Sequence, residues 1–462
     1  MIGYREILKL VWPLALGMIN NAVMQFADRA YLAHHSLTAL EAALPAGMLM
    51  WIFAGFFQSV VGYSSVFVGQ FHGAGEAAKC RATYRAALLL AAVAGVLSFP
   101  CVTLGKWILS MTASNGALLA DEASYFTITM SGGLAVYVQT AAASYFTGRG
   151  ETRLVFWVNL LGNAFNIVLD PVLIFGGCGL PALGIAGAAY ATVASMVVQA
   201  VVLVGAVERS FARDRNVASP LLSDPKGEAT FRSREGNFNL LLRLLRFGIP
   251  SGLYTILNMA TFTVFVFVTE GVGALELAVS NACFSVNYLL FAPMEGFSLG
   301  ASTLVAQAIG RGEPEAAVVA ARRSVILGVA FAAILSGVTL LFAHPILGLF
   351  AANAGAEAGA FHALGTTLLA LMATWLLFDA ADIIVSGALK GAGDTKFVMV
   401  WMVANSLVLW LPLVFVVRRV HNTMPALWAT MIVYIVILCL GSFVRWNRGA
   451  WRGIRLCPEV MG

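Results

Sequence analysis

Hydrophobic residues dominate this chain in long runs, and short polar segments interrupt them at regular intervals. A helix needs about 20 mostly apolar residues to cross the hydrocarbon of a bilayer, and this length selects twelve runs. The predicted spans are 10–32, 44–70, 86–109, 123–146, 154–175, 184–206, 247–269, 277–307, 324–349, 363–389, 397–417 and 424–444. The pattern predicts an all-α polytopic membrane protein with twelve transmembrane helices.

Composition supports this prediction. Of the 462 residues, 60% are hydrophobic and 11% are charged, and the mean hydropathy of +0.85 lies outside the range of soluble domains. The six cysteines contain no C-x-x-C pair, so neither a disulfide framework nor a zinc site is predicted. The first apolar run continues through Asn20, Asn21 and Asp28 without a cleavage site, so we expect a retained span rather than a signal peptide.

Positive charge falls almost entirely on one side of the predicted spans. The N-terminus, the even-numbered loops and the C-terminal tail carry 24 of the 28 Lys and Arg residues. The exceptions are Arg29, Lys106, Arg418 and Arg419. Such a bias predicts cytoplasmic termini in a multi-pass protein of the bacterial inner membrane. It also explains the net charge of +5 without a nucleic-acid partner, so the expected partners are a small-molecule substrate and the lipid bilayer, and the expected state is a monomer.

The sequence repeats itself. Val68–Glu76 matches Val305–Glu313 at an offset of 237, and Gly148–Arg153 matches Gly391–Lys396 at an offset of 243. Each half therefore has six spans that start on the same side, which predicts two six-helix bundles related by a pseudo-twofold axis along the membrane normal.

The predicted domain boundaries follow from this repeat and from the longest polar stretch. They are an N-terminal six-helix lobe at 1–206, a cytoplasmic linker at 207–243, a C-terminal six-helix lobe at 244–445 and a cytoplasmic tail at 446–462.

A polar stripe runs along the predicted fifth span. Asn159, Asn163, Asn166 and Asp170 are spaced four, three and four residues apart, so their side chains share one face of a helix. A carboxylate at membrane depth costs at least a few kcal/mol unless it is paired, hydrated or protonated. Pro171 cannot donate a hydrogen bond to the carbonyl of Ile167, which leaves that oxygen available beside Asp170. The stripe predicts a cation site, and the alternative is a polar helix contact with a proline kink.

A second stripe lies in the first span, where Asn21, Gln25 and Asp28 are spaced four and three residues apart. Two stripes that each end in a carboxylate can face each other across a bundle interior. Alternatively, Asp28 lies at the membrane interface beside Arg29 and is simply solvated.

The two halves differ at these acids, because the repeat places Phe265 opposite Asp28 and Leu413 opposite Asp170. The C-terminal half instead has Asp379 and Asp382 in its tenth span, and Asp382 has an alternative structural role near Ser386 and Lys390.

Thr192, Ser195 and Gln199 form a neutral polar face in the sixth span. This face completes the N-terminal cluster, or its members bond back to their own helix.

These motifs resemble the multidrug and toxic compound extrusion (MATE) transporters. The residues that carry the resemblance are Gly148–Thr152 leading into Gly162–Pro171, the second Gly391–Thr395 turn, and twelve spans in two halves. The resemblance implies export of cationic or amphipathic compounds in exchange for Na⁺ or H⁺, with no other cofactor.

The resemblance also implies roles for single residues. The coupling cation, including a possible Na⁺, would lie at Asp28, Asn166 and Asp170 with help from Thr192, and Asn163 on the same face is assigned to this site. Pro13 matches a proline whose helix bends in some members, and Pro171 is the second expected bending point. The substrate cavity or a secondary cation site is assigned to Asn21, Gln25, Asn258, Asp379 and Asp382.

One position departs from the family. NorM-like members have a glutamate in the seventh span that pairs with an aspartate in the tenth, and here Asn258 stands where we place that glutamate, although Asp379 matches the aspartate. A C-terminal Na⁺ site is thereby weakened. We therefore expect the main coupling site in the N-terminal half.

Two other functions stay open from the sequence. One is export or flipping of an endogenous metabolite or lipid-linked precursor, because substrate choice depends on cavity shape. The other is an intramembrane enzyme, but no D-D-x-x-D or H-E-x-x-H motif occurs, and His34 and His35 have no evident third ligand. We expect a transporter and not an enzyme.

Overall fold

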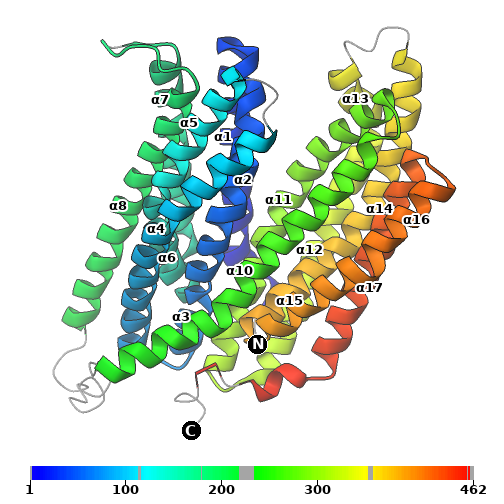
Figure 1. Cartoon of the computed structure of the whole chain (residues 1–462). Helices are drawn as coiled ribbons and strands as arrows, with labels where there is room; N and C mark the ends of the chain where they lie inside the picture. The colour runs from blue at the N-terminus through cyan, green and yellow to red at the C-terminus, as the bar shows by residue number, and fades with distance from the viewer. Residues whose placement is uncertain are drawn as a thin grey trace. The chain divides into compact units, whose positions relative to one another are not determined.

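The computed structural model describes residues 3–112, 116–177, 179–217, 234–351, 357–454 and 456–457. These residues form long helices joined by short turns (Figure 1). The β-type pairing within them is an isolated bridge between Gly177 and Leu180. The prediction of an all-α protein is therefore confirmed.

The helices follow one another in two series. The first half contains α1 (Tyr4–His35), α2 (Leu37–Gly62), α3 (Ser64–Gly73), α4 (Ala77–Thr112), α5 (Gly116–Ser131), α6 (Gly133–Arg149), α7 (Thr152–Ile174) and α8 (Ile185–Val217). The second half contains α10 (Arg234–Glu270), α11 (Ala274–Gly310), α12 (Pro314–Leu341), α13 (Ala343–Ala351), α14 (Ala358–Gly391), α15 (Thr395–Ala404), the π-helical turn η2 (Asn405–Trp410), α16 (Leu411–Val420), α17 (Met424–Asn447) and the short η3 (Ala450–Gly453).

Eleven helical segments of the described chain are long and apolar enough to cross a membrane, and each corresponds to one predicted span. The remaining prediction, 123–146, falls on α5 and α6, which are too short to count singly. Gly132 lies between them, where a Cβ atom would collide with Val193 of α8. The fourth span is therefore present as two consecutive helices that meet at a glycine.

The Gly-rich turns of the repeat end helices. Gly75, Gly150, Gly312 and Gly393 all have positive φ values, between 73° and 95°, a conformation that glycine adopts without strain. The residue after Gly150 donates its backbone N–H to the carbonyl of Phe146 at 2.9 Å, which is the capping pattern of a left-handed helix end. The repeated motif is thus a helix stop that precedes the next span.

The described chain forms two compact units. Unit 1 comprises Met1–Met18, Leu257–Val305 and Glu313–Arg455, and unit 2 comprises Ile19–Ile256, Ala306–Gly312 and Leu456–Gly462. The boundary between the two units cuts α1, α10 and α11. Units 1 and 2 therefore differ from the two sequence repeats. The lobe boundaries at 206 and 244 stay a prediction.

The predicted linker and tail are described only in part. Helix α8 continues to Val217 and α10 begins at Arg234, and residues 218–233 lie outside the described residues. The tail is described to residue 454 and again at Leu456 and Cys457.

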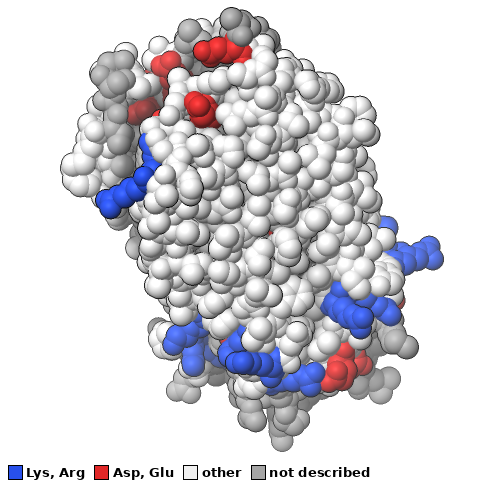
Figure 2. All heavy atoms as spheres, turned by 90° about the vertical axis from the view of Figure 1, so that its right-hand side faces the viewer, with Lys and Arg blue, Asp and Glu red and all other residues white. Residues whose placement is uncertain are grey.

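Charged side chains are unevenly distributed over the surface shown in Figure 2. Most Lys and Arg residues on this face gather at one end, Asp and Glu residues stand at both ends, and a wide belt between them carries almost no charge. A surface that contacts lipid hydrocarbon requires such a belt. The chain is a multi-pass membrane protein.

Candidate functional site

The polar stripe of α7 is buried inside unit 2. Asn163 is 3% exposed, and Asn166 and Asp170 are fully buried. The opposite face of the same helix carries apolar side chains that are largely exposed, with Leu161 at 68% and Val168 at 69%. Helix α7 therefore turns its polar face inward and leaves its apolar face for lipid.

Asp28 of α1 and Asp170 of α7 face each other in this interior. Asp28 is 8% exposed, and the two carboxyl groups approach closely enough to share a hydrogen bond. Such a bond requires a proton on one of them. The structure thus brings together the two acids that the sequence placed at the ends of separate stripes, and Asp28 is buried rather than solvated at an interface.

Asn166 bridges the acidic pair. In the amide orientation that satisfies both of its ends, Nδ2 donates to Asp28 Oδ1 at 3.0 Å and Oδ1 accepts from the backbone N–H of Thr192 at 3.2 Å. In the opposite amide orientation, Nδ2 instead donates to Asp170 Oδ1 at 3.4 Å. Asn166 therefore contacts both acids and donates to one of them in either orientation.

The oxygen atoms at this point suit a small hard cation. Asp170 Oδ2 is buried and receives no hydrogen bond, and carboxylate and amide oxygens are the ligands that hard cations prefer. The described residues contain no group of three or more His, Cys, Asp or Glu side chains that could hold a metal ion.

The hydroxyl groups of Thr192 and Ser195 on α8 bond back to their own helix, which is one of the two alternatives that the sequence left open. Thr192 Oγ1 donates to the carbonyl of Ala188 at 3.0 Å, and Ser195 Oγ donates to the carbonyl of Thr192 at 2.9 Å. Both hydroxyl protons thus bond back to their own helix. The oxygen lone pairs of Thr192, which is 6% exposed, stay available to a cation.

A second group of side chains, the amide ladder, continues the stripe across four helices of unit 2. Asn163 Nδ2 donates to Asn21 Oδ1 at 2.7 Å, and Gln199 Nε2 donates to Asn163 Oδ1 at 3.5 Å. Gln139 Nε2 is shared between Gln199 Oε1 at 2.7 Å and Asn159 Oδ1 at 3.1 Å. The ladder can offer both donors and acceptors to a polar ligand.

Gly162 makes the ladder possible, because a Cβ atom at this position would collide with the side chain of Gln199. We expect Gly162→Ala to displace Gln199, break its two ladder bonds and destabilise the protein by about 1–3 kcal/mol. Gly205→Ala is the matched control on α8, since nothing lies within 4 Å of an added Cβ there. Thermal unfolding of the purified protein checks this, and equal midpoints for the two variants would contradict it.

Sequence reasoning missed some residues near the acidic pair. Tyr125 of α5 interacts electrostatically with both Asp28 and Asp170. Gln139 joins the ladder. Neither belongs to a stripe of amide or acidic residues on its own helix, so neither produces a periodic signal.

The C-terminal half fills the corresponding position with aromatic rings. Phe265, the counterpart of Asp28, is fully buried and stacks on Trp410 at 5.3 Å, and Trp410 stacks on Tyr434 at 4.5 Å. The asymmetry predicted from the repeat is therefore present in the packing. Only the first half has an acidic pair at this position of the described fold.

The remaining predicted residues of the second half lie in unit 1. Asn258 on α10 and Asp379 on α14 are half-buried, and Asp382 is 2% exposed. The charged neighbours of Asp379 are Asp382 and Glu295, and Glu295 of α11 was missed by the sequence prediction. The repeat could have indicated this residue, because it places the charged Glu295 opposite the neutral Gln58.

Pro13 lies inside the unbroken helix α1, and Pro171 lies inside the unbroken helix α7. Gln25 is half-buried on α1. Bending at the two prolines stays a prediction.

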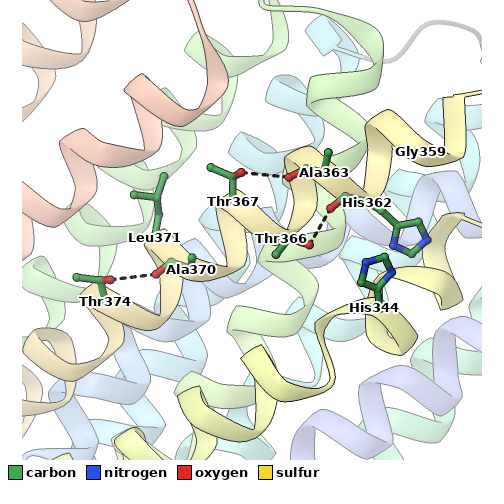
Figure 3. A pocket seen from close by; sticks show the side chains of 9 residues that line it. All are labelled: His344, Gly359, His362, Ala363, Thr366, Thr367, Ala370, Leu371 and Thr374. Atoms are coloured by element: carbon green, nitrogen blue, oxygen red, sulfur yellow. Dashed lines mark hydrogen bonds between the residues drawn. The ribbon is translucent and has the colours of Figure 1, made fainter.

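A groove of about 850 Å³ runs along α13 and α14 of unit 1 (Figure 3). His344 and His362 stack at its end with ring centroids 4.7 Å apart. The hydroxyls of Thr366 and Thr374 donate to carbonyls of their own helix at 2.8 and 3.0 Å. None of the predicted site residues lines this groove, and its hydroxyl protons are already bonded, so we do not assign the site to it.

The chain has two repeats of six membrane spans, and one half holds a buried acidic pair. This architecture is that of a membrane transporter of the two-repeat class. The family profile MatE matches residues 13–172 and 250–416, one segment in each half. The chain belongs to this family, the MATE transporters.

Curated relatives and solved structures match over nearly the whole chain. A probable multidrug resistance protein NorM of Thermotoga maritima is 23% identical and covers 97% of this chain and 93% of the relative. Another from Rhodopseudomonas palustris is 26% identical, with coverages of 96% and 92%. A structure described as an outward-facing multidrug resistance MATE family transporter has a TM-score of 0.83 at 20% identity and covers 98% of this chain and 97% of its own. At this identity the structural likeness shows the fold.

Proposed function

We propose that this protein is a secondary antiporter that exports cationic or amphipathic small molecules in exchange for H⁺ or Na⁺. The observation that carries the proposal is the buried acidic pair, Asp28 and Asp170, with the Asn166 amide in contact with both acids. Relatives named as multidrug resistance proteins support the substrate class.

The acidic pair supplies a physical basis for ion coupling. Two carboxylates in a low-dielectric interior cannot both ionise cheaply, so the pair holds a shared proton or a cation. Release of that ion to one side of the membrane leaves two like charges in contact, which favours a rearrangement of α1 against α7. Exchange of ion and substrate through such a rearrangement is antiport.

The positive-inside bias supports cytoplasmic termini in the bacterial inner membrane. We propose a monomer as the working unit, with the coupling ion as its only cofactor and with no nucleic-acid partner.

Reconstituted proteoliposomes test the function. Efflux of a fluorescent organic cation should follow an imposed pH gradient, a Na⁺ gradient, or both, and should stop when an ionophore collapses that gradient. Transport that is indifferent to both gradients would refute antiport. Equal fluxes in liposomes with and without the protein would refute transport of that cation.

A further inference from the structure

Unit 1 contains a group of four charged side chains, the C-terminal charge cluster, on α11 and α14. Its members are Glu295, Asp379, Asp382 and Lys390. Asp379 interacts electrostatically with Asp382 and Glu295, and Lys390 interacts with Glu295 and Asp382. The cluster therefore combines three carboxyl groups with one ammonium.

The packing of α11 on α14 fixes the position of Glu295. Ser298 Oγ donates to the carbonyl of Ile383 at 2.8 Å, and Gly387 and Gly391 face the backbone of Ser298 and Ser302 so closely that a Cβ atom would collide. The two helices therefore run parallel, and Ser298 and Ser302 on α11 lie beside Gly387 and Gly391 on α14. Glu295, one turn before Ser298, lies level with the segment that carries Asp379 and Asp382.

Lys390 lies between the two contact glycines, at the end of α14. Side chains of a helix tilt toward its N-terminus, so the ammonium extends back toward Asp382. The acid that follows in sequence, Asp394, is already engaged, because Arg445 Nε donates to its Oδ2 at 2.7 Å. Glu295 and Asp382 of the cluster are electrostatic partners of Lys390.

The cluster has a buried and an accessible end. Asp382 is 2% exposed and its Oδ1 receives no hydrogen bond, although a buried carboxylate oxygen normally has a partner. Asp379 is half-buried and Glu295 is exposed. A ligand can therefore reach two of the three acids, and the third lacks a donor at one oxygen.

The repeat shows that the charges of the cluster are confined to the second half. The four equivalent positions of the first half are neutral, with Gln58 opposite Glu295, Val136 opposite Asp379, Gln139 opposite Asp382 and Thr147 opposite Lys390. Gln58 there makes a neutral bond, donating to Thr140 Oγ1 at 3.3 Å. The second half thus differs by three acids together with one base, as expected if the base compensates the acids.

We propose that the Lys390 ammonium is the resident counter-ion of Glu295 and Asp382, and that a monovalent organic cation binds at Glu295 and Asp379 in competition with it. The inference rests on the proposed export of cationic compounds and adds a residue that limits how tightly they bind. A site that contains its own cation carries one negative charge less when no ligand is bound. It also binds a cationic ligand weakly enough to release it.

Equilibrium binding of radiolabelled tetraphenylphosphonium to the purified full-length protein tests the inference. Lys390→Met keeps the aliphatic stem and removes the competing charge. Affinity should rise about tenfold, the size expected for removing one charge roughly 10 Å from the ligand at an effective dielectric of about 20. Lys390→Arg should retain the weak affinity, and Lys390→Met combined with Glu295→Gln should return toward it.

Lys396→Met is the matched control, because Lys396 is exposed six residues further along and carries the same charge. Its affinity should equal that of the unmodified protein. An unchanged or weaker affinity for Lys390→Met, or an equal gain for Lys396→Met, would overturn the inference and show that Lys390 is only a lysine at a helix end.

A measurement without the organic cation separates this inference from the proposed function. In Lys390→Met, Na⁺ should replace the missing ammonium, so NaCl should raise the thermal unfolding midpoint more than in the unmodified protein, with N-methylglucamine chloride balancing ionic strength. If this occurs although the protein exports no tetraphenylphosphonium, the counter-ion role stands and the export proposal fails. If export occurs without either effect of Lys390→Met, the counter-ion role fails alone.

Discussion

Replacing either Asp28 or Asp170 with asparagine should abolish ion-driven efflux, with a loss of at least about a hundredfold, roughly the effect of removing one charge in a low-dielectric site. Asparagine keeps the size of each side chain but removes the negative charge that holds a proton or Na⁺. One carboxyl group then remains, without the second acid that shares a proton or a cation with it. Gradient-driven efflux from proteoliposomes at matched protein content is the measurement.

Asp379→Asn is the comparison variant, because Asp379 lies in the other half and its charged neighbours are Asp382 and Glu295. We expect it to change the apparent affinity for cationic substrates while the ion gradient still drives transport. If Asp379→Asn abolished coupling and the variants of Asp28 and Asp170 transported normally, the coupling site would lie in the C-terminal half.

The sequence predicted the stripes on α1 and α7 because helical periodicity alone places their members on one face. Burial of Asn163, Asn166 and Asp170 follows from that periodicity, since the residues between them are apolar and turn outward. The pairing of Asp28 with Asp170 required only that two such faces meet inside one bundle.

Other features depend on tertiary contacts that no local pattern records. Gln139 and Glu295 belong to no polar stripe on their own helices, and their partners lie on other helices. At Gly132, between α5 and α6, the close approach of Val193 leaves no room for a Cβ atom. The helix ends also differ from the span limits, because α4 begins at Ala77 and the prediction began at residue 86, where the apolar run starts.

The repeat carries information about the second half that composition does not. Where the first half has Asp28, the second has Phe265 in a stack with Trp410, so the same backbone position is ionic in one half and aromatic in the other. Conversely, the C-terminal charge cluster stands at positions whose equivalents in the first half are neutral. Each half thus holds charge at different helices, which allows ion and substrate to be bound by separate sites.

The two repeats meet through a reciprocal contact inside unit 2. A Cβ atom at Gly73 would collide with the backbone carbonyl of Gln307, and one at Gly310 would collide with the carbonyl of Gln70. These four residues are matched pairs of the repeat, and Gln307 Nε2 also donates to the carbonyl of Gly148 at 2.7 Å. Rigid backbone atoms cannot move aside as a flexible side chain can.

Gly73→Ala and Gly310→Ala should therefore each force the end of α3 away from the end of α11, destabilise the protein by about 1–3 kcal/mol or more and slow transport strongly. One separation relieves both collisions, so the double variant should be little worse than either single one, a clear departure from additivity. Gly47→Ala in α2 is the control, because nothing lies within 4 Å of an added Cβ there. Thermal midpoints and efflux rates of the four variants check this. Additive losses in the double variant would show that the two glycines act at independent contacts.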